Sequence, residues 1–132
     1  MIREVLLSAL SKSFRGRGMK IGTAPVIAVF PAAHPSVGDV TIRDDGNEAT
    51  VSIGIITHQH FNPYDSSLSA NQLAAWVTEE VVAFLEQLFA DRILLQKGRT
   101  TNWGRMQRIG DGEDIPAIRD DCFAFLWSGP LN

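Results

Sequence analysis

The chain has 132 residues, which is the size of one domain and enough to bury a substantial core. Apolar residues make up 45% of it and charged residues 20%, a composition that indicates a globular protein and excludes a disordered one. The net charge of −3 argues against general nucleic-acid binding, and no apolar run reaches the roughly 20 residues of a membrane span. Glu4 stands where a secretory signal would be basic, and the single cysteine, Cys122, fits a reducing compartment, so we expect a cytoplasmic protein.

The first third of the chain predicts one helix and one strand. Apolar residues recur at helical spacing from Ile2 to Leu10, which predicts an amphipathic helix that ends near Gly16. The run from Pro25 to Phe30 is short, apolar and bounded by prolines, which is typical of a buried or edge strand.

The next segment predicts a β-hairpin between residues 37–43 and 48–57. Both runs alternate polar with branched apolar residues, and an Asp45-Gly46 pair between them favours a two-residue turn. In that register Arg43 lies opposite Glu48 and Val40 lies opposite Val51. The buried face would then carry five apolar side chains, namely Val40, Ile42, Val51, Ile53 and Ile55.

A polar connection at residues 58–67 leads to a long predicted helix. Ser69 and Gln72 have the spacing of a capping box. Apolar residues then recur every three or four positions up to Leu88, and no glycine or proline interrupts the pattern before Asp91. We expect this helix to cover the apolar face of the hairpin.

The last third predicts strands at residues 93–96 and 122–127, with 105–109 as a candidate short strand in an irregular segment. The element order α-β-β-β-α-β-(β)-β predicts a single α+β domain over residues 1–132. We expect a two-layer sandwich with a mostly antiparallel sheet and one long helix packed on one face.

Three histidines form a candidate metal site. His58 and His60 would point to one side of the third strand, and His34 follows the first strand. In a simple three-strand meander all three would meet at one edge, where imidazoles bind zinc or iron; the nearest carboxylates in sequence are Asp39 and Asp65. The alternative is that the histidines are ordinary exposed residues at strand ends, and no cofactor is expected in that case.

Glu80 is a candidate buried charge. At 100° per residue it falls between Val77 and Phe84, inside the edge of the apolar stripe of the long helix. A carboxylate in such a position is either a desolvated acid with a chemical role or a flank residue that reaches water.

No catalytic motif is present, so the leading functional hypothesis is a non-enzymatic protein-interaction module that binds a partner or a second copy of itself. Trp103 and Tyr64 are the expected exposed anchors, with Arg105 in a basic segment beside Trp103. The alternatives are a small metal-dependent enzyme that uses the histidines, and a small-ligand or anion-binding domain. A ligand pocket between sheet and helix would be lined by Trp76 and Trp127.

Overall fold

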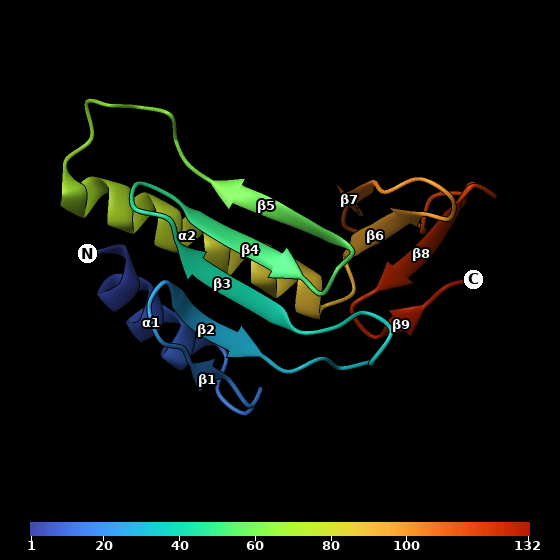
Figure 1. Cartoon of the computed structure of the whole chain (residues 1–132), viewed down its shortest axis with the longest axis horizontal. Coiled ribbons are helices and arrows are strands. Elements are labelled where there is room, and N and C mark those ends of the chain that lie inside the picture. Colours follow the sequence, from blue (N-terminus) through green and yellow to red (C-terminus); the bar gives the residue numbers. More distant parts are fainter.

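The structure, a computed structural model, describes the whole chain, residues 1–132. It confirms an α+β fold built from antiparallel sheets and one long helix (Figure 1). The elements in chain order are α1 (Ile2–Ser13), β1 (Lys20–Ile21), β2 (Val26–Phe30), β3 (Val40–Asp44), β4 (Ala49–Ile53), β5 (Thr57–Phe61), α2 (Ala70–Phe89), β6 (Ile93–Gly98), β7 (Gly104–Arg108), β8 (Cys122–Leu126) and β9 (Gly129–Pro130).

The strands form two sheets where the sequence indicated one. The first sheet has the order β1-β2-β3-β4-β5 and the second has the order β7-β6-β8-β9. Figure 1 shows α1 and α2 side by side against one face of the first sheet, with its other face uncovered. Neither helix has both the length and the apolar character needed to cross a membrane.

The long helix begins as predicted. The Ser69 hydroxyl accepts the N–H of Gln72 at 3.1 Å, and the Gln72 side chain accepts the N–H of Ser69 at 2.8 Å, so both halves of the capping box are present. The helix ends at Phe89, two residues before the expected limit. Its fully buried stripe, which packs on the first sheet, consists of Ala74, Val77, Val81, Leu85 and Leu88.

The hairpin forms with the predicted faces but in a different register. Val40 pairs with Ile53 and Ile42 pairs with Val51, so the strands are shifted by two residues from the two-residue turn. The N–H of Asp45 donates to the carbonyl of Glu48 at 3.0 Å, which closes a longer turn. Because side chains alternate with a period of two, this shift leaves the buried face unchanged.

The chain reverses earlier than predicted after β4. It turns at Gly54, whose φ is +49° and where a Cβ would lie 2.2 Å from the carbonyl oxygen of Val37. The expectation that Ile55 is buried is therefore wrong, because this side chain is 85% exposed in the turn. Residues 58–61, expected as part of a polar connection, belong to the extra strand β5.

An aromatic cluster ties the helices, the first sheet and the end of the chain together. Phe14 at the C-cap of α1, Phe30 of β2 and Phe89 of α2 meet edge to face with centroids 5.3–5.7 Å apart. Trp127 lies 5.2 Å from Phe89 and is buried. The second sheet joins the same core through Ile93 and Leu95, while the other side of β6 packs in a small separate cluster.

Candidate functional site on strand β5

The uncovered face of the first sheet is polar, in contrast to the face under the helices. On this face Thr50 of β4 lies opposite His60 of β5, and Ser52 lies opposite His58. No helix covers these side chains, so they are not needed for the hydrophobic core. They are available for binding or chemistry.

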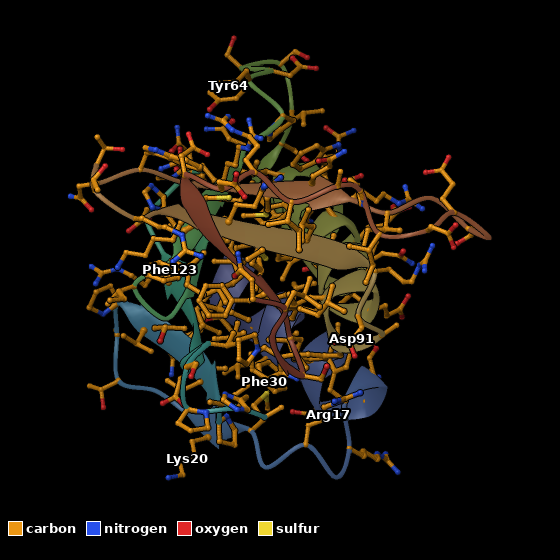
Figure 2. All side chains as sticks on the ribbon, turned by 90° about the vertical axis from the view of Figure 1, so that its right-hand side faces the viewer. Arg17, Lys20, Phe30, Tyr64, Asp91 and Phe123 are labelled. Carbon is orange, nitrogen blue, oxygen red and sulfur yellow. The ribbon has the colours of Figure 1, made fainter.

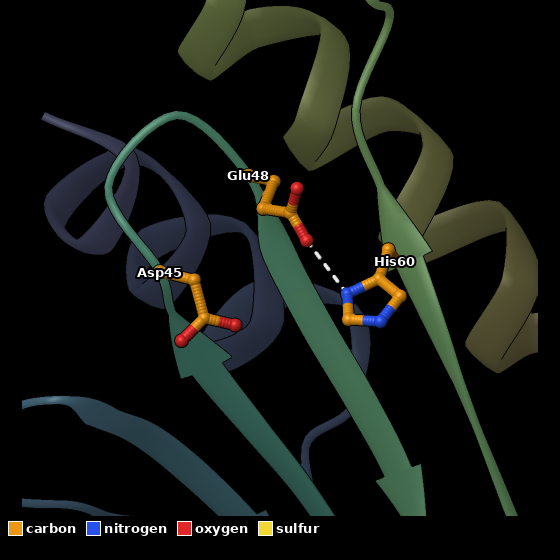
Figure 3. A group of neighbouring side chains, drawn as sticks. All are labelled: Asp45, Glu48 and His60. Carbon is orange, nitrogen blue, oxygen red and sulfur yellow. Dashed lines mark ion pairs between the residues drawn. The ribbon is translucent and has the colours of Figure 1, made fainter.

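The most organised group on this face consists of Asp45, Glu48 and His60 (Figure 3). Asp45 and Glu48 come from the turn between β3 and β4, and His60 comes from the adjacent strand. One ligand-type atom from each of the three residues lies within 4.8 Å of the others. The His60 Nδ1 is 2.6 Å from Glu48 Oε2, so this nitrogen carries a hydrogen that the carboxylate accepts when the pair is hydrogen-bonded.

Neighbouring polar groups hold both carboxylates in place. The nearly buried Thr50 hydroxyl donates to Asp45 Oδ2 at 2.5 Å and also lies 3.0 Å from His60 Nδ1. The Asn62 side-chain amide donates to Glu48 Oε1 at 3.2 Å. A hydrogen bond that orients a ligand is a common feature of binding sites for ions and of proton-transfer sites.

The two neighbouring histidines lie close together, but only one joins the carboxylates. The His58 and His60 rings are arranged edge to face with centroids 5.1 Å apart. The side chain of His60 is 49% exposed, and its Nε2 has no hydrogen-bond partner. This geometry suits either an imidazole that accepts a proton at Nε2 or one that binds an ion.

The predicted convergence of all three histidines is wrong. Four antiparallel strands lead from β2 to β5, so β5 runs opposite to β2. His60 lies in the row of Arg43, at the start of β2, whereas His34 follows the other end of β2. Three strand spacings of about 4.8 Å also place β2 and β5 about 14 Å apart. His34 instead lies against Gly129 of β9, and its Nδ1 accepts the N–H of Ser36 at 3.1 Å.

The carboxylates proposed from sequence are occupied elsewhere. Asp39 accepts the N–H of Ala32 at 2.8 Å, and Asp65 accepts both the N–H and the hydroxyl of Ser67. Neither carboxylate belongs to the group around His60.

Glu80, the candidate buried charge, is not buried. Its side chain is exposed on α2, outside the buried stripe, and lies at the rim of a cleft beside β5. The interpretation that it flanks the stripe and reaches water describes its position.

The expected aromatic anchors lie on separate surfaces. Tyr64 is 81% exposed in the loop between β5 and α2, at the end of the molecule opposite Arg17 and Lys20 (Figure 2). Trp103 is half-buried, and the exposed Arg105 lies 5.7 Å from the centre of its ring. The three residues named from sequence therefore do not form one contact surface.

The structure does not assemble the predicted pocket between Trp76 and Trp127. Trp76 packs on the main core, whereas Trp127 lines a hollow of about 380 Å³ together with Arg15 and Arg17. The Arg17 guanidinium lies 4.5 Å from the centre of the Phe89 ring, and both residues line that hollow.

A cleft of about 450 Å³ lies between β5, α2 and the second sheet. The edges of β5 and β7 meet where a Cβ on Gly104 would lie 1.7 Å from the carbonyl oxygen of Ile56. β5 and β7 belong to different sheets and are not hydrogen-bonded neighbours. The cleft is lined by Gln59, Phe61, Glu80, Ala83, Phe84, Glu86, Gln87, Ile93, Met106 and Arg108.

Backbone groups of β5 face this open edge. At the far end of the β3–β4 ladder, the N–H of Gly54 donates to the carbonyl of Asp39 at 2.8 Å. In this register the backbone N–H and C=O groups of Thr50 and Ser52 also point toward β3. Because N–H and C=O groups alternate in direction along a strand, the intervening residues of β4 bond to β5. The same alternation leaves the N–H and C=O of His60 pointing away from β4, toward the free edge.

Sequence reasoning missed Asp45 and Glu48 because it treated them as turn residues only. The available signal was the alternation of the outward residues His58 and His60 with the inward residues Thr57, Gln59 and Phe61. It is a weak signal for one more strand of the meander, because Thr57 and Gln59 are polar. That extra strand returns His60 to the end of the sheet where the acidic turn lies.

No protein family, curated protein or solved structure matches this chain. The functional argument therefore depends on the geometry described above.

Proposed function

We propose that this domain is a protein-interaction module that binds an extended segment of a partner protein at the free edge of β5. The observation that supports the proposal most directly is the cleft of about 450 Å³ that borders this edge. An edge strand presents unpaired N–H and C=O groups, and a partner segment can satisfy them by adding one more strand.

The backbone on both sides of the cleft is suited to strand addition. His60 directs its N–H and C=O to the edge of β5, as argued above. In the second sheet, the carbonyl of Trp103 accepts the N–H of Gly98 of β6 at 3.0 Å, and the N–H of Ile109 donates to the carbonyl of Arg92, just before β6, at 2.8 Å. By the same alternation Met106 and Arg108 direct their backbone groups away from β6.

The floor of the cleft provides side-chain specificity. Phe61 of β5 and Phe84 of α2 have ring centroids 5.5 Å apart, and Met106 lies on the opposite wall. Alternate side chains of an added strand would point at this apolar floor, while the others would point to solvent. An apolar anchor that fills such a pocket contributes much of the binding energy of typical interfaces.

The charges at the rim indicate the chemistry of the partner. Glu80 and Glu86 lie on the helix side of the cleft, and Arg108 lies on the second sheet. Two acidic groups against one basic group favour a segment with apolar residues at alternate positions and a basic residue at the end nearest α2.

A selection from a random peptide library displayed on phage tests the proposal. The wild-type protein should enrich peptides with alternating apolar residues. His60→Pro removes the N–H at the edge, at a position where an edge strand tolerates proline, and should abolish the enrichment. His60→Ala keeps that N–H and should retain the enrichment. The two variants together separate the contribution of the backbone of residue 60 from that of its side chain.

A second pair of variants tests the floor of the cleft. Met106→Glu should lower the affinity for the selected peptides by about tenfold or more, since it places a charge against their apolar anchor. Gln107→Glu adds the same charge on the opposite face of β7 and should have little effect. Binding that survives both His60→Pro and Met106→Glu would contradict the proposal.

Sedimentation across a concentration series identifies one alternative occupant. A dimer that is lost in His60→Pro would mean that the edge pairs with a second copy of this chain. A monomer at all concentrations would leave a separate protein as the partner.

A further inference from the structure

We infer that Asp45, Glu48 and His60 form a binding site for one first-row transition-metal dication on the uncovered face of the first sheet. The inference is independent of the proposed peptide binding, because it uses the side chain of His60 and not its backbone. The two features lie on the same strand but face different directions.

The distances are close to those that an ion requires. Two ligand atoms at about 2.1 Å from one tetrahedral ion lie about 3.4 Å apart. The three candidate ligand atoms lie within 4.8 Å of one another, and His60 Nδ1 and Glu48 Oε2 are 2.6 Å apart. Movements of up to about 1.4 Å would therefore complete the set, and the Asp45 side chain is 36% exposed in the turn between β3 and β4.

Hydrogen accounting is consistent with an ion that takes the place of the hydrogen on Nδ1 of His60. Without metal, the Nδ1 hydrogen of His60 lies between Glu48 Oε2 and Thr50 Oγ1, at 2.6 and 3.0 Å from the nitrogen. A neutral imidazole can transfer that hydrogen to its exposed Nε2 through solvent, which leaves the Nδ1 lone pair for the ion. No proton is released overall in that case, and two carboxylates balance the charge of a dication.

Surrounding groups hold the ligands before the ion arrives. The Thr50 hydroxyl donates to Asp45 Oδ2, and the Asn62 amide donates to Glu48 Oε1. Arg43 is the one cation near the group, with Nε 3.9 Å from Asp45 Oδ1, and it would compete weakly with an ion. Such outer hydrogen bonds orient ligands in many metal sites.

The ligand types select the class of metal. One imidazole nitrogen and two carboxylate oxygens suit Zn²⁺, Mn²⁺ or Fe²⁺, whereas Ca²⁺ and Mg²⁺ prefer oxygen ligands alone. Among these ions Zn²⁺ binds more tightly than Fe²⁺ or Mn²⁺ at most sites with nitrogen and oxygen ligands. Zn²⁺ is therefore the probe of choice.

The nearest competing arrangement is an ion held by the two neighbouring histidines. Their rings are close enough for such a pair, with centroids 5.1 Å apart. In that case His58 would be a ligand and Glu48 would only orient His60. The experiment must distinguish these two sites.

Titration calorimetry with ZnCl₂ on the full chain, purified without an affinity tag and treated with chelator, provides the test. We expect one Zn²⁺ per chain, and at least about tenfold weaker binding for Asp45→Asn, Glu48→Gln and His60→Ala. His58→Ala is the matched control on the same strand and face, and it should change the affinity less than about twofold.

Two further measurements keep the result interpretable. Circular dichroism without metal shows whether each variant is folded. If a variant is not folded, NMR amide shifts of the wild-type protein on addition of Zn²⁺ should be centred on Asp45, Glu48 and His60. Absence of Zn²⁺ binding up to millimolar concentration would overturn the inference. Loss of binding in His58→Ala with retention in Glu48→Gln would also overturn it, as would equal binding of Mg²⁺.

Discussion

The two faces of the first sheet differ in what covers them and in what their side chains do. Val51 on the inner face is fully buried under the helices, while its neighbour Ser52 lies on the outer face beside His58. The inner face is apolar because burial of its side chains drives folding. The outer face carries hydroxyls, imidazoles and carboxylates that the core does not need, which is why both functional hypotheses involve the outer face or the edge of β5.

This comparison separates residues that stabilise the fold from residues that are available for function. Substitutions on the inner face should change stability strongly and binding only indirectly. Substitutions on the outer face should change binding with little cost in stability. Three predictions test this separation.

The largest effect should come from a charge on the inner face. Val51→Asp would place an unpaired carboxylate in a fully buried position and should destabilise the protein by on the order of 3–5 kcal/mol. Ser52→Asp places the same group one residue away on the outer face and should cost less than about 1 kcal/mol. Urea unfolding followed by circular dichroism measures both, and equal losses would mean that the outer face is not open as described.

The inner face and its helix could be predicted from sequence because local spacing encodes them. Val40, Ile42, Val51 and Ile53 alternate with polar residues, and all four are buried. The capping box likewise marks the start of α2 by a local motif, because Ser69 and Gln72 are only three residues apart.

The register of the hairpin could not be read from the same pattern. Shifting one strand by two residues pairs Val40 with Ile53 instead of Val51, yet it leaves the same side chains on the same face. The choice between the two registers depends on the turn, where Asp44 Oδ1 accepts the N–H of Gly46 and Asp45 bonds to Glu48.

The outer site was hidden for a related reason. β5 is an edge strand at the margin of α2, so its inward residues Thr57 and Gln59 are polar and the alternation is weak. Without β5, the sequence pattern places His60 beyond the end of β4, far from the turn that carries Asp45 and Glu48. The strand reversal that brings them together is a tertiary feature that residue spacing alone does not encode.

A smaller effect should follow from loss of the cap on α2, the helix that covers the inner face. Ser69→Ala leaves the N–H of Gln72 without its side-chain acceptor and should lower the free energy of unfolding by about 1 kcal/mol. Ser66→Ala, an exposed serine of the same loop, is the control and should change it by less than about 0.5 kcal/mol. Thermal unfolding compares the two. If the comparison of faces is correct, Ser69→Ala leaves Zn²⁺ affinity unchanged, because the cap supports the covered side of the sheet only.

The smallest effect concerns Asp65, in the loop that joins the outer edge strand to α2. Hydrogen bonds from the Ser67 hydroxyl, and then from the Ser67 N–H, lower the pKa of Asp65 below its usual 3.8. A lowered pKa means that ionised Asp65 contributes to stability above its ordinary pKa and that the contribution is lost as the pH falls through the folded-state value. Ser67→Ala removes the larger cause, so the pKa should rise toward 3.8 while the remaining N–H keeps it below that value. An NMR titration of the carboxyl carbon measures the change, with Ser66→Ala as the control. Because Asp65 is exposed and screened by solvent, the accompanying loss of stability near neutral pH should be small. A clear loss of stability at neutral pH in Ser67→Ala would show that this loop supports the inner face after all.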